Sequence, residues 1–261
     1  MWVWLHLFLW SVAAAPVNDA VFADILTRYN RDAQMPLPAL TPRQRADMLS
    51  GKVLQHLERR DDGNWWVAGM LVCQCTKESL WLATQDLHFT SQDDAIEANV
   101  SMAPHQASWY ALLDLPRPFS DRHWVIDVWD NVTLAKASDN VFWEHPWKLR
   151  EGGAELVRPK VERGEVEGLD LATFDAAVYT PINEGAWVFI DLPDGRSLIA
   201  YHLVTVVGGN IPDRLVAEFV RRNMENQLRT LESRAIEVVP QHYRSGHTPV
   251  LGVNDAPVPF Y

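Results

Sequence analysis

The chain has 261 residues, of which 48% are hydrophobic and 22% charged, and this balance predicts a globular protein with a sizeable core. Its formal net charge of −11 argues against a nucleic-acid partner, because an acidic protein repels a phosphate backbone. The same charge argues against adhesion to anionic lipid through a broad basic patch. Twelve tryptophans are many for this length, and tryptophan suits cores, interfaces and the apolar walls of ligand sites.

The first segment, residues 1–15, resembles a secretory signal peptide. An apolar run from Trp2 to Val12 precedes three alanines, and the run is too short to span a bilayer. The segment contains no Lys or Arg, and Pro16 follows the expected cleavage point, so a mis-chosen start codon and an N-terminal anchor are the alternatives. We expect an exported protein, periplasmic or secreted, if this segment is a signal peptide, and a cytoplasmic protein otherwise.

Residues 16–44 are predicted to be an arm or linker before the main domain. A short helix is expected at 21–29, and the proline-rich segment that follows ends it. Thr41 and Pro42 are typical of a helix start, with Thr as the N-cap and Pro at the first helical position. A second helix is therefore expected from this point to about Ser50.

The middle of the chain is predicted to consist mainly of strands. An Asp-Gly pair at 62–63 and another at 194–195 each separate two apolar runs, which is typical of β-hairpins. A helix is expected at 76–84. The polar stretch 144–170 is predicted to be a loop or lid rather than a second domain. The expected strands are 52–59, 65–75, 96–103, 106–115, 122–135, about 172–180, 185–192 and 197–207.

The last regular element is predicted to be a long amphipathic helix. From Pro212 to about Val239 the apolar residues recur at steps of three and four. Gly208 and Gly209 provide the turn into this helix. The remaining residues, 241–261, contain several prolines without periodicity and are interpreted as an extended tail.

The only two cysteines, Cys73 and Cys75, are too few for a disulfide framework. In a strand their Cα atoms would lie about 6.5–7 Å apart, at the edge of what a disulfide spans. Two buried free thiols are therefore the favoured interpretation, with a local disulfide or a metal contact as alternatives. No spacing of histidines and cysteines predicts a metal site, and we expect neither a metal ion nor a cofactor.

The most distinctive segment covers 115–129. Two prolines fix a turn, and a strand with strict alternation follows. Trp124, Ile126 and Val128 share one face of this strand, which we interpret as the interior because the other face carries the charge. Arg122 lies at the inner edge, where it can form a structural salt bridge or a single polar contact to a ligand headgroup.

Three segments occur in the order seen in START domains. They are the run Pro-Arg-Pro-Phe-Ser-Asp-Arg-His-Trp-Val at 116–125, the hairpin at 185–201, and Gly-Gly-Asn-Ile-Pro at 208–212 followed by the long helix. Over roughly 45–240 the chain therefore resembles the START family and the broader helix-grip superfamily, which is polyketide-cyclase-like and Bet v 1-like. The resemblance implies an α+β fold in which a curved antiparallel sheet wraps around a long C-terminal helix. It also implies a ligand tunnel between sheet and helix, and the family's ligands include sterols, phospholipids, ceramides and polyketides.

The function that the resemblance implies is non-catalytic binding, and with it transfer, of a hydrophobic small molecule, with a lipid as the favoured class. A transient membrane contact would go with it, and no particular oligomeric state is predicted. We expect ligand access through a hinge at Gly208 and Gly209, or through movement of 144–170, while the long helix stays folded. The candidate ligand-lining residues are Trp109, Arg122, Trp124, Ile126, Val128, Tyr201, Val216, Phe219 and Val220.

Two alternatives remain open at this point. The same scaffold could catalyse a reaction, as in polyketide cyclases and aromatases, with Arg122, Tyr201, His202 and His123 as acid–base groups. An enzyme would need such polar side chains to converge inside the cavity, whereas a carrier needs almost none. A structural or protein-interaction role is the third hypothesis, and a filled interface between sheet and helix would favour it.

Overall fold

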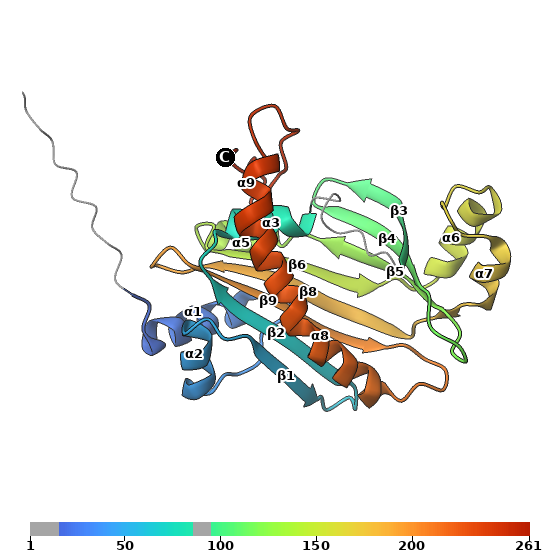
Figure 1. Ribbon diagram of the computed structural model, residues 1–261, viewed down its shortest axis with the longest axis horizontal. Coiled ribbons are helices and arrows are strands. Elements are labelled where there is room, and N and C mark those ends of the chain that lie inside the picture. The colour runs from blue at the N-terminus through green and yellow to red at the C-terminus, as the bar shows by residue number, and fades with distance from the viewer. Residues whose placement is uncertain (1–15, 86–94) are drawn as a thin grey trace, which may run out of the picture.

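The computed structural model describes residues 16–85 and 95–261, and a nine-stranded sheet is its central feature (Figure 1). The strand order is β1-β2-β9-β8-β6-β5-β4-β3, with every neighbouring pair antiparallel. The two-residue strand β7 pairs in parallel with β5. The strands are β1 (Leu54–Arg59), β2 (Trp65–Cys73), β3 (Ala95–Ala103), β4 (Gln106–Leu113), β5 (Arg122–Trp129), β6 (Phe142–Leu149), β7 (Val178–Tyr179), β8 (Ile182–Asp191) and β9 (Ser197–Val206).

The long helix α8 (Asp213–Ser233) crosses one face of this sheet, which we call the inner face (Figure 1). It packs against β1, β2 and β9 and approaches closest at Gly69, where an added Cβ would lie 3.0 Å from the Cβ of Met224. The predicted α+β helix-grip fold, a curved antiparallel sheet around a long C-terminal helix, is therefore confirmed. The buried residues of α8 fall at steps of three, four or seven, which is the stripe of an amphipathic helix: Ala217, Met224, Leu228 and Leu231.

Two pairs of helices cover the opposite face, which we call the outer face. Helices α1 (Asp19–Asp32) and α2 (Pro42–Leu49) pack on the half formed by β2, β9, β8 and β6. Helices α6 (Gly153–Glu162) and α7 (Leu171–Ala176) pack on the half formed by β3, β4 and β5. Because the side chains of a strand alternate between the two faces, a strand can contribute residues to hydrophobic clusters on both faces of the sheet.

Residues 16–44, expected to be an arm or linker, are fastened to the outer face by one buried carboxylate. Glu144 is completely buried and accepts hydrogen bonds from the backbone N–H groups of Gln34 (3.1 Å) and Met35 (2.8 Å). It also accepts from the Tyr29 hydroxyl at 3.1 Å and from the Asn131 amide. Burial first, and then the charge and hydrogen bond of Glu144, raise the pKa of Tyr29. The segment is thus a packed part of the domain.

The other expected helices and both hairpins are confirmed, and the C-terminal helix is longer and less regular than expected. Thr41 caps α2 in a capping box with Gln44, and α3 (Lys77–Gln85) follows the first hairpin. After α8 the chain passes through a π-helical stretch, Arg234–Val238, into α9 (Val239–His242). Among the described residues, no helix is long and apolar enough to cross a membrane.

Three expectations for individual segments are wrong. The stretch 144–170 is not a loop, because it contains most of β6 and the whole of α6, which buries Val157 and Val161 against the sheet. The region 172–180 is mostly α7, whose first turn the Asp170 side chain caps. The strand expected at 122–135 ends at Trp129, and α5 (Val132–Ala137) follows it.

The favoured interpretation of the cysteines is also wrong, since Cys73 and Cys75 form a disulfide. Cys73 is the last residue of β2, and the chain bends directly after it. The bend shortens the Cα–Cα distance to 5.4 Å, within the usual range for a disulfide. The sequence argument placed both residues in one extended strand and therefore overestimated this distance.

The segment 241–261, expected to be an extended tail, packs against the domain. The Tyr243 hydroxyl accepts a hydrogen bond from the N–H of Val250 (2.9 Å) and donates one to the carbonyl of Val258 (3.1 Å). The indole N–H of Trp81 in α3 donates to the carbonyl of Leu251 (2.9 Å). These contacts close the end of the inner face next to α3. The segment expected to be a signal peptide, 1–15, lies outside the described residues.

Candidate ligand-binding cavity

The inner face has a pocket of about 300 Å³ that is open to solvent, and we call it the cavity. Strands β3, β4, β5, β6, β8 and β9 and the end of α3 supply its walls, so residues from most of the chain meet there. Six aromatic and three aliphatic residues share its lining with five polar ones. The lining residues are Thr84, Gln85, Glu97, Trp109, Tyr110, Ala111, Trp124, Ile126, Val128, His145, Trp147, Asn183, Trp187 and Tyr201.

A stack of three aromatic rings forms one wall. Tyr201 lies between Trp187, at 4.2 Å between ring centroids, and Trp147, at 5.4 Å. Gly185 makes room for this arrangement, because an added Cβ would lie 2.4 Å from Cζ2 of Trp147. Burial raises the pKa of Tyr201 to about 12, so its hydroxyl stays protonated at neutral pH. The Trp147 indole N–H donates to the Asn183 side chain at 3.0 Å, which fixes the ring.

The structure brings five of the nine predicted lining residues together around this cavity. Strand β5 supplies three of them, on the face that the alternation pattern marked as interior. Each of these side chains is partly buried and touches the cavity rather than a completely filled core. The five residues are Trp109, Trp124, Ile126, Val128 and Tyr201.

The three predicted residues on the C-terminal helix do not line the cavity. Phe219 is 69% exposed, so its expected inward position is wrong. The reason is the rotation of α8 about its axis, which places Ala217 and Met224 against the sheet. Val216 is half-buried, and Val220 packs at the edge of the cluster that contains Ile126.

Arg122 is buried and holds a turn, instead of facing the cavity. Its guanidinium donates to the carbonyls of Val207 (2.7 Å) and Gly208 (3.0 Å), and also to that of Ser120. No carboxylate of the described chain pairs with it, so the expected salt bridge is absent. Gly208 and Gly209 have φ of +71° and +69°, and Arg122 fastens this turn just before α8. The turn at which the sequence predicts a hinge is thus held by hydrogen bonds from Arg122, and the hinge stays a prediction.

His123 and His202, two of the candidate acid–base groups, lie on the outer face. His123 packs among Tyr110, Phe174 and Tyr179, and burial lowers its pKa. His202 is 3% exposed, and burial lowers its pKa to about 4. With Arg122 clamping the turn, Tyr201 is the one member of the predicted catalytic set that lines the cavity.

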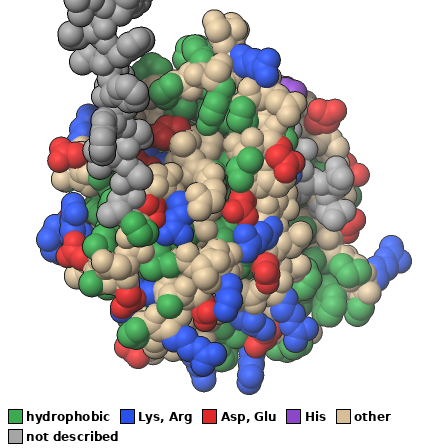
Figure 2. All heavy atoms as spheres, turned by 60° about the vertical axis from the view of Figure 1, so that its left-hand side comes forward, with side chains coloured by type: hydrophobic (Ala, Val, Ile, Leu, Met, Phe, Trp, Pro, Cys, Tyr) green, Lys and Arg blue, Asp and Glu red, His purple; other side chains and the backbone are tan. Residues whose placement is uncertain are grey.

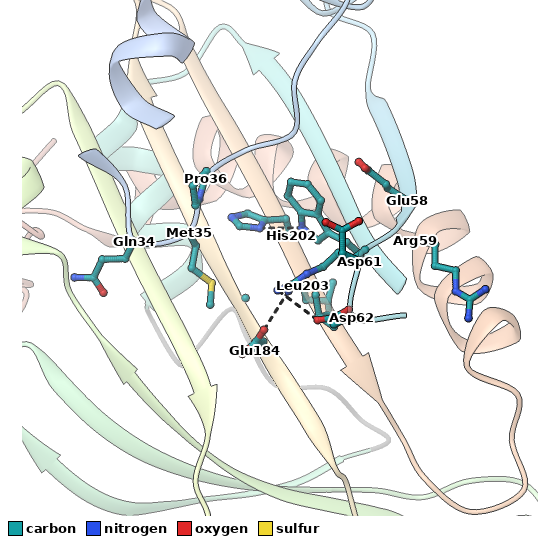
Figure 3. Close-up of a pocket in the computed structure, with 14 residues that line it drawn as sticks. Gln34, Met35, Pro36, Glu58, Arg59, Asp61, Asp62, Glu184, His202 and Leu203 are labelled. Carbon is teal, nitrogen blue, oxygen red and sulfur yellow. Dashed lines mark hydrogen bonds and ion pairs between the residues drawn. The ribbon is translucent and has the colours of Figure 1, made fainter. Parts of the chain in front are cut away.

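A larger depression of about 710 Å³ lies on the outer face around His202 (Figure 3). Figure 3 shows that the segment 34–36, the β1–β2 hairpin and strands β8 and β9 surround it. Its rim is charged, and Arg60 forms ion pairs there with Glu184 (3.2 Å) and Asp62 (3.5 Å). Because its walls carry many charged side chains, the depression does not suit a hydrophobic ligand.

Nine of the fourteen lining residues were not predicted from the sequence, among them His145, Trp147 and Trp187. The first two alternate along β6, which begins in front of the stretch interpreted as a loop. Had the alternation from Phe142 to Trp147 been taken as a strand, it would have placed both on one face. His145 also pairs with Asp130, since its Nδ1 lies 2.8 Å from the carboxylate.

Within residues 16–85 and 95–261, no group of three or more His, Cys, Asp or Glu side chains is placed to hold a metal ion. On the side of the molecule shown in Figure 2, Lys and Arg are interspersed with Asp and Glu and form no continuous basic patch.

Comparison with known proteins agrees with this fold. No family model and no curated protein sequence matches the chain. Among solved structures, human STARD10 has a TM-score of 0.55 at 10% identity, over 87% of this chain and 83% of that one. Human StAR-related lipid transfer protein 5 has a TM-score of 0.52 at 13% identity, over 84% and 96% of the two chains. The STAR-related lipid transfer protein (fragment 25–204) from Xanthomonas axonopodis has 0.51 at 15% identity, over 70% and 93%.

The chain therefore has the fold of the STAR-related lipid transfer, or START, domains. At these identities the similarity concerns the fold alone. The chemistry of the cavity has to be argued from the residues that line it.

Proposed function

We propose that this protein binds a hydrophobic small molecule, with a lipid as the favoured class, in the inner-face cavity. The observation that carries the proposal is the cavity itself, whose walls contain four tryptophans, Tyr201 and two aliphatic residues of β5. Two proteins of the same fold are named for lipid transfer, which supports the same kind of ligand.

The energetics of such a cavity favour occupancy by an apolar molecule. The aromatic and aliphatic side chains of the lining lose unfavourable contact with water when an apolar molecule covers them. Burying hydrocarbon there contributes about 0.8 kcal/mol for each CH₂ group. The polar side chains of the lining can orient such a ligand.

Native mass spectrometry of gently purified protein tests the proposal, followed by titration with a fluorescent fatty alcohol. We expect a co-purifying lipid or saturable uptake of the fluorescent compound. Replacing Trp187 by alanine should weaken uptake, whereas replacing Trp66 on the outer face should not. A homogeneous protein that carries no lipid and takes up no compound would contradict the proposal.

We further propose that the protein transfers its ligand through transient membrane contact. Leu215 (63% exposed) and Phe219 lie one turn apart on α8, and Phe119 is exposed in the turn before β5. Arg122 joins that turn to the one before α8, so these side chains gather at one end of the molecule. The double variant Leu215→Ser/Phe219→Ser should lose binding to phosphatidylcholine vesicles. Ile236→Ser, which changes an exposed apolar residue elsewhere on the C-terminal helical segment, is the matched control.

The proposal also includes export, with residues 1–15 removed as a signal peptide. The Cys73–Cys75 disulfide supports it, because disulfides persist mainly in oxidising compartments. Cell fractionation and N-terminal sequencing of the mature protein test this part. An intact N-terminus in the cytoplasmic fraction would contradict it.

A further inference from the structure

Among the polar side chains that line the cavity, His145 of β6 is oriented by a carboxylate. Its Nδ1 lies 2.8 Å from Oδ1 of Asp130. A carboxylate accepts hydrogen bonds and cannot donate them, so Nδ1 carries the proton. No hydrogen bond within the described chain uses Nε2, so this nitrogen is available to a ligand in the cavity.

A chain of further contacts holds Asp130 in place. Its Oδ2 lies 2.9 Å from Nδ1 of His105, and Nε2 of His105 lies 2.9 Å from Oδ1 of Asp255. The hydrogen bond with Asp130, together with Asp255, raises the pKa of His105, which favours a protonated ring between two carboxylates. His105 and Asp255 both have positive φ, +58° and +68°. Such backbone is costly for non-glycine residues and persists where the surroundings fix it.

The position of His145 relative to the aromatic stack defines a direction across the cavity. His145 is the register partner of Trp187 on β8, and Trp187 is the partner of Tyr201 on β9. The three side chains thus form one row on the inner face, with the imidazole at one end and the stacked rings at the other. An elongated molecule along this row would place its apolar part on the rings.

We propose that His145 is the polar anchor of the ligand, and that its Nε2 accepts a hydrogen bond from a hydroxyl group. This inference rests on the proposed function and narrows the ligand to a lipophilic alcohol. An ether or a hydrocarbon of the same shape has no proton to donate. An ionised carboxylate headgroup likewise has no proton to donate to Nε2.

A comparison of three compounds against two variants tests the anchor. Decanol, decyl methyl ether and decane are titrated calorimetrically into the wild-type protein and into His145→Phe, which keeps a ring beside Trp81 but removes the acceptor. His123→Phe is the matched control, because His123 is a buried histidine of the outer face. The His145→Phe variant should bind decanol about threefold to tenfold more weakly than the wild type does. Its affinity for the ether and for decane should be unchanged.

The outcomes separate the anchor from the cavity. Equal changes for decanol and the ether in His145→Phe would overturn the anchor and leave hydrophobic binding intact. Failure of all three compounds to bind the wild type would overturn the proposed function, and the anchor with it. A decanol-specific loss in His123→Phe would also count against the anchor.

A spectroscopic readout distinguishes an anchor from a merely structural histidine. The ¹⁵N signals of the His145 ring should show Nδ1 protonated and Nε2 bare in the free protein. Decanol should shift the Nε2 signal, and the ether should leave it unchanged. An Nε2 that is protonated in the free protein, or a signal that both compounds shift equally, would contradict the inference.

Discussion

On the outer face of the sheet Ala186 is completely buried in the cluster that α1 completes, whereas on the inner face Ala111 borders a cavity of about 300 Å³. The histidines differ in the same way. His123 and His202 are buried on the outer face with lowered pKa values, and Nε2 of His202 has no hydrogen-bond partner there among the described residues, whereas the His145 ring borders the inner cavity. The region under α1 and the region around Ala111 therefore differ in how completely they are filled, and not in the types of residue that they carry. The charged depression around His202 is a separate part of the outer face.

This difference teaches that residue type alone does not mark a site in this fold. A strand places neighbouring side chains on opposite faces, so Glu144 anchors the outer helices while His145 borders the cavity. What distinguishes the inner face is that α8 covers β1, β2 and β9 and leaves β3 to β6 open beside it. We therefore expect the ligand-binding site on the part of the inner face that α8 does not cover.

The strongest test of the filled outer face is Glu144→Ala. The change leaves two backbone N–H groups, the Tyr29 hydroxyl and the Asn131 amide without their buried acceptor. We expect a loss of about 4 kcal/mol in the free energy of unfolding, measured with urea. Glu151→Ala, at an exposed position, should change it by less than about 0.5 kcal/mol. A loss below about 1 kcal/mol for Glu144→Ala would show that the anchor is not what holds the segment.

Measurements of stability over a range of pH test the burial of His202 on the outer face. His202 has a folded-state pKa of about 4, below its unfolded value of 6.5, so the unfolded state binds more protons between these values. The contribution of His202 to the free energy of unfolding is fully present above about pH 6.5. It falls by about 3 kcal/mol as the pH falls toward 4. His202→Gln should flatten this part of the curve of stability against pH relative to the wild type. Identical slopes for the two proteins would contradict the assignment.

The two alanines provide a direct comparison of packing. Ala186→Leu adds volume to a filled cluster and should cost about 1–3 kcal/mol of unfolding free energy. Ala111→Leu should cost less than about 1 kcal/mol because its side chain enters the cavity, and it should reduce uptake of the fluorescent alcohol. Calorimetric melting and the uptake assay measure the two effects. Equal destabilisation by both changes would mean that the inner face is as full as the outer one.

The smallest expected effect concerns the disulfide at the end of β2. It closes a loop of only three residues, so removing it in Cys73→Ala/Cys75→Ala should cost about 1.5 kcal/mol in the chain-entropy model. Dithiothreitol should lower the stability of the wild type by a similar amount and leave the double variant unchanged. A wild type that contains two free thiols by mass spectrometry after non-reducing purification would refute the bond.

The sequence predicted the elements that local chemistry defines. The cap at Thr41, the two Asp-Gly turns and the amphipathic period of the last helix each lie in a few neighbouring residues. The alternation in β5 likewise placed Trp124, Ile126 and Val128 on the cavity side. These predictions are correct because the tertiary contacts favour the same local structure as the sequence pattern does.

The errors arose where long-range packing decides. Phe219 fits an apolar helical stripe, but the close approach of Met224 to Gly69 sets the rotation of α8 and turns Phe219 outward. The sequence offered Arg122 as a ligand contact. Its hydrogen-bond partners include two carbonyls that lie 85 and 86 residues away in the chain. His145 could not be found because its role depends on Asp130 and on a cavity that five other strands complete.

The indole N–H signals of the tryptophans test the central claim, that the inner face binds an apolar ligand, most directly. Trp109, Trp124, Trp147 and Trp187 line the inner cavity, while Trp66 borders the outer depression. In a ¹H–¹⁵N correlation spectrum with assigned indoles, added decanol should shift the four inner signals and leave Trp66 in place. A shift confined to Trp66, or four inner signals that do not respond to saturating decanol, would contradict the account.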